Sequence, residues 1–105
     1  MKNPQNDKKP LSLTIIRKKL KKFPGWKYSE TEKKIRKELK FPGFVEVVAL
    51  IKELTPFCEK MDHHPDVHIY YNRAIFELQR FDVGGKVTER DFTIAKKIEQ
   101  LYKAS

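Results

Sequence analysis

Cysteine is almost absent from this 105-residue chain, in which Cys58 is the single example. One thiol excludes an internal disulfide framework and a cysteine-rich zinc site, and it is typical of a reducing cytoplasm. Apolar runs are short, and none approaches the roughly 20 residues that a membrane-spanning helix requires. Residues 1–10 are polar and lysine-rich with no apolar stretch behind them, which argues against a secretory signal. We therefore expect a cytoplasmic protein without a membrane segment.

Positive charge is concentrated at the beginning of the chain. Lys and Arg number 23 against 14 Asp and Glu, which gives a net charge of +9. Residues 1–40 carry 14 basic and 4 acidic side chains, whereas the remainder is close to neutral. Such a region can attract nucleic acid, an acidic partner or an anionic small molecule. Because no nucleic-acid recognition motif accompanies the charge, we interpret it as a solvated helix face and tail and do not expect a nucleic-acid partner.

The length and the aromatic content predict one globular domain. Seven Phe, four Tyr and one Trp argue against a disordered chain, and 105 residues correspond to a single domain. Residues 1–10 lack the side chains that build a core. We therefore expect a disordered basic tail over residues 1–10 and one domain over residues 11–105.

Hydrophobic spacing divides the domain into three helices and four strands. The helices are expected over residues 12–22, 44–61 and 88–101. The strands are expected over residues 26–28, 35–41, 67–71 and 74–81, with Asn72-Arg73 as the reversal between the last two. Hairpin pairs favour an antiparallel sheet. The expected fold class is therefore α+β, with three helices packed on one face of a four-stranded antiparallel sheet.

The helix expected over residues 44–61 has an apolar face. Its members recur at helical spacing and are Phe44, Val47, Val48, Ile51, Leu54 and Cys58. Pro56 lies inside this helix and has no backbone N–H. We therefore expect one helix that bends near Lys52.

All three histidines of the chain, His63, His64 and His68, fall within six positions at the end of that helix. An imidazole donates and accepts a proton near neutral pH, so two adjacent histidines at a turn fixed by Pro65 suit acid–base catalysis. Asp62 can orient one of the rings. The alternative is that the pair caps the helix carbonyls and complements the helix dipole. A metal site is a third interpretation, which the spacing does not favour.

A more specific signal is the segment Glu59-Lys60-Met61-Asp62-His63-His64-Pro65, followed by Tyr71-Asn72, Gly85 and Thr88-Glu89-Arg90-Asp91. In these residues the sequence resembles the pterin-4a-carbinolamine dehydratase family, whose animal members also serve as the dimerisation cofactor of homeodomain transcription factors. The resemblance extends from about Leu11 to Leu101, and it includes Trp26 and a Phe-x-x-Phe pattern at Phe41 and Phe44.

This resemblance implies a four-stranded antiparallel sheet with helices on one face, assembled as a homodimer or homotetramer. It also implies the dehydration of 4a-hydroxytetrahydropterin to quinonoid dihydropterin, with no metal or other cofactor. The hydroxyl must be protonated while a ring N–H loses a proton, which imidazoles can accomplish. By resemblance, His63 is the acid–base group. His64 assists it and, with Asp62 and Pro65, binds the pterin edge.

The sequence departs from the family where a third histidine is usual. In the stretch Arg80-Phe81-Asp82, which the resemblance places beside the pterin, Phe81 occupies the expected histidine position. A phenyl ring stacks on a flat heterocycle but cannot transfer a proton. His68 is a poor substitute because strand alternation can direct it to the other face. The alternative function is therefore a catalytically weakened family member that serves as a pterin-binding or protein-interaction module.

Two further residues have competing interpretations. Asp91 corresponds to an acidic residue near the family's site, which makes it a third catalytic candidate. It is also the third helical position of a capping box that begins at Thr88, and helix stability alone accounts for it there. Arg80 can meet an anionic substrate tail, but an ordinary surface charge is the simpler interpretation.

Overall fold

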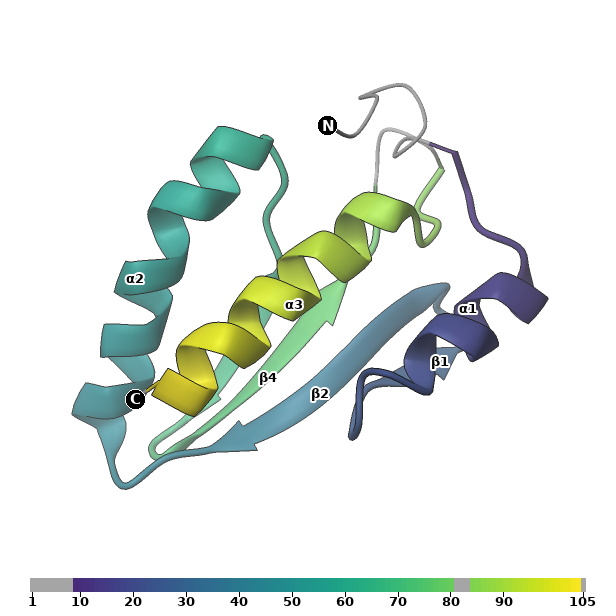
Figure 1. The fold of residues 1–105 in the computed structure, drawn as a ribbon. Coiled ribbons are helices and arrows are strands. Elements are labelled where there is room, and N and C mark those ends of the chain that lie inside the picture. Colours follow the sequence, from purple (N-terminus) through teal and green to yellow (C-terminus); the bar gives the residue numbers. More distant parts are fainter. Residues whose placement is uncertain (1–8, 81–83, 105) are drawn as a thin grey trace.

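The computed structural model describes residues 9–80 and 84–104, which form three helices and four strands. Along the chain the order is helix, two strands, helix, two strands, helix (Figure 1). The bounds are α1 Leu13–Leu20, β1 Lys27–Ser29, β2 Lys34–Lys40, α2 Phe44–Met61, β3 Asp66–Tyr70, β4 Arg73–Leu78 and α3 Glu89–Ala104. The predicted α+β class and element order are confirmed.

The four strands form one antiparallel sheet in the order β1-β2-β4-β3. The long central pair runs from Ile35 opposite Leu78 to Lys40 opposite Arg73. Figure 1 shows α2 and α3 side by side across one face of the sheet, with α1 beside β1. Among the described residues no helix covers the second face, and β3 is one of the two edges.

The core lies between the sheet and the helices. Successive side chains of a strand point to opposite faces, so Ala74, Phe76 and Leu78 of β4 all face the helices and are fully buried. The helices contribute side chains at helical spacing: Val47, Leu50, Leu54 and Cys58 from α2, and Ile94, Ala95 and Ile98 from α3. Each large apolar side chain contributes about 1.5–3 kcal/mol when fully buried. This packing fixes the end of α2 close to the start of α3.

The buried face of α2 differs from the predicted one. Leu50 is buried, whereas Phe44 and Val48 are 50% and 43% exposed. Residues 47, 50, 54 and 58 follow one stripe of the helix surface, and residues 44, 48 and 51 follow the neighbouring stripe. Both stripes are apolar, and hydrophobic spacing alone did not separate them. The helix continues through Pro56 to Met61.

The turn between β3 and β4 lies one residue earlier than predicted. Tyr70 pairs with Arg73, so the two turn residues are Tyr71 and Asn72. Tyr71 takes a left-handed backbone conformation with φ of +50°. Two-residue hairpin turns need positive φ, which Asn usually provides. The predicted reversal at Asn72-Arg73 was wrong, because the pairing of Tyr70 with Arg73 makes Tyr71 the first residue of the turn. Strand β4 also ends earlier than predicted, at Leu78.

The first described residues are attached to the fold. Pro10 forms an isolated bridge with Thr88, and the N–H of Leu11 donates to the carbonyl of Val87 at 2.9 Å. Most of the predicted tail lies outside the described residues, as do Phe81 and Asp82. In the part of the chain that is described, no helix has the length and apolar character needed to cross a membrane.

Candidate active site

The end of α2 is a tight turn that reverses the chain. Asp62 caps the helix in the left-handed conformation (φ 51°, ψ 44°), and the N–H of His63 donates to the carbonyl of Cys58 at 3.1 Å. This conformation costs an L-residue roughly 1–2 kcal/mol, and Asn and Asp tolerate it best. Asp62 therefore serves the turn through its backbone. The reversal sends His63 inward and leaves His64 exposed.

His63 is buried, with 8% of its surface exposed. Its Nε2 lies 2.5 Å from Oδ1 of Asp91, a fully buried residue in the first turn of α3. A carboxylate on one ring nitrogen fixes both the orientation and the tautomer of an imidazole. The structure thus brings together two of the residues that the sequence singled out, from the ends of two different helices.

The other oxygen of Asp91 caps α3. Oδ2 accepts hydrogen bonds from the backbone N–H of Thr88 at 2.7 Å and from its Oγ1 at 3.2 Å. This is one half of the capping box that the sequence predicts, because the carboxylate at the third helical position reaches back to the N–H of the cap residue. The N–H of Asp91 donates to the backbone carbonyl of Thr88 at 3.1 Å and not to its hydroxyl. The two interpretations of Asp91 are therefore compatible, because one oxygen stabilises the helix start while the other holds His63.

His64 lies at a small groove between α2 and β3. The groove has a volume of about 140 Å³ and is lined by Ile51, Leu54, Thr55, Cys58, His64, Pro65 and Val67. Nε2 of His64 is 2.5 Å from Oε2 of Glu59. The carboxylates that contact the two imidazoles are thus those of Asp91 and Glu59, in place of the predicted Asp62. Sequence reasoning missed this role of Glu59, although the residue begins the histidine motif.

His68 faces away from the helices. Val67 lines the groove beside α2, so the next residue along the strand points to the second face of the sheet, here called the open face. There Nε2 of His68 lies 3.1 Å from Oε1 of Glu77. The structure does not bring His68 to the other two histidines.

Glu77 is a buried carboxylate on that open face. Nζ of Lys34 lies 2.8 Å from its Oε1, and Nε of Arg36 lies 3.4 Å from its Oε2. Burial alone would raise the pKa of Glu77, but hydrogen bonds from Lys34 and His68 outweigh it and hold the pKa below the ordinary value. The hydrogen bond to Glu77 in turn raises the pKa of Lys34. The cluster ties β2, β3 and β4 together.

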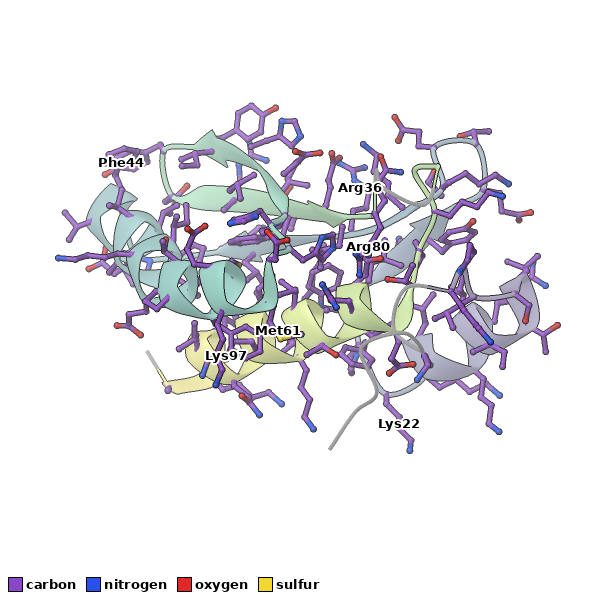
Figure 2. The ribbon with its side chains drawn as sticks, turned by 90° about the horizontal axis from the view of Figure 1, so that it is seen from above. Lys22, Arg36, Phe44, Met61, Arg80 and Lys97 are labelled. Atoms are coloured by element: carbon purple, nitrogen blue, oxygen red, sulfur yellow. The ribbon has the colours of Figure 1, made fainter. Side chains whose placement is uncertain are left out.

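Arg80 lies inside the protein, with 4% of its surface exposed (Figure 2). Its interpretation as a surface charge is therefore wrong. The N–H of Arg80 donates to the carbonyl of Lys86 at 2.9 Å, and its carbonyl accepts from Gly85 at 2.8 Å. These bonds close the loop after β4. The predicted binding residues Phe81 and Asp82 lie outside the described residues.

A second contact joins the end of α2 to the start of α3. Nη1 of Arg90 donates to the backbone carbonyl of Met61 at 2.9 Å, one of the acceptors that a helix end leaves free. Figure 2 shows Met61 beside α3. The arginine belongs to the motif quoted above, but sequence spacing gives no sign that it reaches this distant carbonyl.

Cys58 lies at the base of the same turn, on the buried face of α2. Burial raises the pKa of its thiol to about 11, so the group is protonated and uncharged at neutral pH. Over residues 9–80 and 84–104, no group of three or more His, Cys, Asp or Glu side chains is arranged to hold a metal ion.

Sequence comparison finds relatives over most of the chain. The family profile described as Pterin 4 alpha carbinolamine dehydratase matches residues 9–101. A protein of Saccharolobus solfataricus with the provisional name pterin-4-alpha-carbinolamine dehydratase is 45% identical over 82 residues, which cover 78% of this chain and 84% of the relative. A protein of the same provisional name from Picosynechococcus sp. is 37% identical over 91 residues, which cover 87% of this chain and 96% of the relative.

Solved structures share the fold. A transcriptional coactivator/pterin dehydratase from Brucella melitensis superposes with a TM-score of 0.84 at 26% identity, covering 90% of this chain and 99% of that one. A pterin dehydratase-like protein described as a RuBisCO assembly factor in the alpha-carboxysome superposes with a TM-score of 0.62 at 17% identity. The match covers 77% of this chain and 93% of that one. With the profile match and the sequence relatives, the assignment follows: this chain belongs to the pterin-4a-carbinolamine dehydratase family.

Proposed function

We propose that this protein dehydrates 4a-hydroxytetrahydropterin to quinonoid dihydropterin. The observation that carries the proposal is the contact between His63 and Asp91 in a chain of this family. The bond between C4a and the hydroxyl oxygen breaks, and an imidazolium supplies the proton with which the oxygen leaves as water. A ring N–H of the pterin gives up a proton in return. The net change is the loss of one water molecule, without oxidation or reduction.

His63 is the acid–base group in this proposal. Because Asp91 holds its Nε2, Nδ1 is the atom that exchanges a proton with the substrate. A buried carboxylate also stabilises the imidazolium that forms when the ring takes up a proton. Asp91 thus acts through His63, as a positioning residue that also balances charge.

The substrate-binding residues are proposed to come from the turn and the neighbouring loop. Asp62 and His64 are exposed on the turn, next to Pro65, and Glu59 orients the His64 ring. They contact the edge of the pterin and assist proton transfer. Arg80, Phe81 and Asp82 supply the other contacts, with the Phe81 ring stacked on the flat heterocycle.

A second candidate function is favoured by Phe81, which stands where the family usually has a histidine. An acid–base group typically contributes about 10²–10⁴-fold to a rate, and its loss would leave a weak enzyme. Such a protein would act as a pterin-binding or protein-interaction module. The shared fold of the protein described as a RuBisCO assembly factor is compatible with this alternative.

One assay separates the two functions. The purified protein is mixed with synthetic 4a-hydroxytetrahydropterin, and dehydration is followed against the uncatalysed rate. For the enzyme we expect an increase of at least about 10²-fold. Turnover at the background rate, together with pterin binding by calorimetry and a gain of activity in Phe81→His, would indicate the weakened member. The absence of both turnover and pterin binding would contradict the enzyme and the pterin-binding module.

We also propose that the protein assembles in the cytoplasm as a homodimer or homotetramer. The start of α2 and the turn between β3 and β4 lie at the same end of the molecule (Figure 1). They present large apolar side chains to solvent, namely Phe44, Val45, Val48, Ile69, Tyr70 and Tyr71. Exposed apolar patches of this kind mark interfaces, and β3 adds an unpaired strand edge.

A further inference from the structure

A groove that the proposed reaction does not use lies between the turn after α1 and the second half of α3. It has a volume of about 310 Å³ and is lined by Lys22, Phe23, Pro24, Lys96, Glu99, Gln100 and Lys103. Small-molecule sites begin at about 300 Å³. Asp91 lies in the first turn of α3, so the groove and the candidate active site occupy different parts of that helix.

Three ammonium groups belong to this groove. Lys22 comes from the end of the α1 region, and Lys96 and Lys103 lie two turns apart on α3. Within the described ranges, which leave out residues 1–8, 81–83 and 105, none of the three forms an ion pair. Figure 2 shows the Lys22 side chain extending away from the body of the protein.

The acidic residue of the groove does not neutralise these lysines. Oε2 of Glu99 accepts hydrogen bonds from Nζ of Lys37 at 2.9 Å and from Nε1 of Trp26 at 3.1 Å. The carboxylate is therefore turned toward the sheet and has its own cation. Lys37 also donates to the carbonyl of Pro24 at 2.9 Å, which fixes the turn that borders the groove.

The same turn is shaped to admit Lys37. Gly25 has φ of +86°, and a Cβ built there would lie 2.8 Å from Cε of Lys37. The positive φ favours glycine here, and a side chain at this position would also push the end of Lys37 aside. The turn that borders the groove is thus held in place, and the pairing of Lys37 with Glu99 leaves the charges of the three lining lysines uncompensated.

One wall of the groove is apolar and held in place. The ring of Phe23 packs edge-on against that of Phe92, with the centroids 5.2 Å apart and the planes at 62°. Pro24 continues this wall. A ligand that fits has a flat apolar part for the wall and negative charge for the lysines.

We propose that this groove binds a small phosphoester with an aromatic or heterocyclic part. Lysine binds phosphate as a point charge, and three lysines match a dianion. The groove follows the side and the carboxyl end of α3, where the helix dipole disfavours an anion and no free backbone N–H is available. The negative charge of the ligand is therefore met by the lysine side chains and not by the helix dipole. The site is independent of the dehydratase reaction.

The test uses phenyl phosphate as the probe, titrated into the full-length protein and followed by amide chemical shifts in two-dimensional NMR. We expect saturable shifts at residues 22–25 and 96–103. The variant Lys22→Gln/Lys96→Gln/Lys103→Gln should bind at least about tenfold more weakly, since each exposed charge contributes roughly a factor of two to five. The dehydration rate should stay unchanged in this variant.

The matched control is Lys18→Gln/Lys40→Gln/Lys52→Gln, which removes the same charge from three exposed lysines outside the groove. It should bind phenyl phosphate within twofold of the wild type. Equal weakening in both triple variants would overturn the proposal, because it would mean binding through net charge. Chemical shift changes spread over the whole surface would overturn it as well. So would a titration that does not saturate by about 10 mM phenyl phosphate, the millimolar limit of weak specific binding. If phenyl phosphate did not bind but a single-stranded oligonucleotide bound the wild type and bound the groove variant much more weakly, the groove lysines would be assigned to nucleic acid instead.

Discussion

His63 and Asp91 are 28 residues apart in the chain, yet Nε2 of the first lies 2.5 Å from Oδ1 of the second. The left-handed cap at Asp62 turns His63 inward, and the N–H of Thr88 holds the other carboxylate oxygen. The contact therefore links the end of α2 to the start of α3. Any movement between these two helices would also move the proposed acid–base group.

Replacing the carboxylate should separate catalysis from folding. In Asp91→Asn the amide still accepts the hydrogen bond of Thr88, but it cannot balance the charge of an imidazolium. We expect kcat to fall by about 10²–10⁴-fold, and the free energy of unfolding to fall by about 1–2 kcal/mol. Steady-state kinetics and urea denaturation measure the two effects.

Thr88→Ala is the matched control for that variant. It removes the 3.2 Å hydroxyl contact and leaves the backbone N–H and His63 in place. We expect a loss of about 1 kcal/mol in stability with kcat within threefold of the wild type. If both variants lost stability equally and Asp91→Asn kept full activity, Asp91 would be a helix cap only.

The cluster around Glu77 predicts a pH-dependent stability. The folded pKa of Glu77 lies below its ordinary value, so its contribution is present above the unfolded pKa of about 4.3 and is lost as pH falls through the folded pKa. At pH 7 we expect Glu77→Gln to lower the free energy of unfolding by about 1–3 kcal/mol. The difference from wild type should shrink below about pH 4.

Urea denaturation across that pH range measures this difference. Glu38→Gln is the control, because Glu38 pairs with Arg73 at an exposed position and should change stability little. A gap between wild type and Glu77→Gln that stays constant from pH 7 to low pH would exclude the ionised Glu77 as its source.

Cys58 should be unreactive in the folded protein. Its thiol is buried on α2 and its pKa is raised to about 11, so little thiolate is present at pH 8. We expect iodoacetamide to modify it only as fast as the protein unfolds, and rapidly in urea. Mass spectrometry after timed quenching gives both rates, and rapid labelling without denaturant would argue against this burial.

The exposed stripe of α2 should control assembly. Val48 is 43% exposed, so Val48→Lys leaves the core intact while placing a charge in the proposed interface. We expect light scattering to show a smaller oligomer than for the wild type, with unchanged helix content by circular dichroism. Lys52→Glu, also on the exposed side of α2, alters charge without removing apolar surface and serves for comparison. A wild-type monomer would contradict the proposal directly.

Much of the fold follows from local sequence patterns. Apolar spacing and β-propensity identified every helix and strand, and α2 has the bounds that were predicted approximately. Tertiary context decided the rest. Tyr71 takes the strained turn position because the pairing of Tyr70 with Arg73 sets the register, and no local signal marks a tyrosine for it.

The candidate site was predictable in its residues but not in its pairings. The motif marked His63, His64 and Asp91, because such short patterns can be recognised in the sequence alone. The pairing of Asp91 with His63 depends on how α3 packs against α2, and the pairing of Glu59 with His64 on the turn at Asp62. Neither distance can be read from spacing along the chain.

The most direct test of the proposed chemistry compares two histidines on opposite sides of the sheet. His63→Ala removes the ring beside Asp91, and His68→Ala removes one that contacts Glu77 on the open face. With 4a-hydroxytetrahydropterin as substrate, we expect kcat to fall by about 10²–10⁴-fold in His63→Ala and to stay within twofold in His68→Ala. Equal rates for wild type and His63→Ala, or a large loss in His68→Ala alone, would contradict the assignment of His63 as the acid–base group.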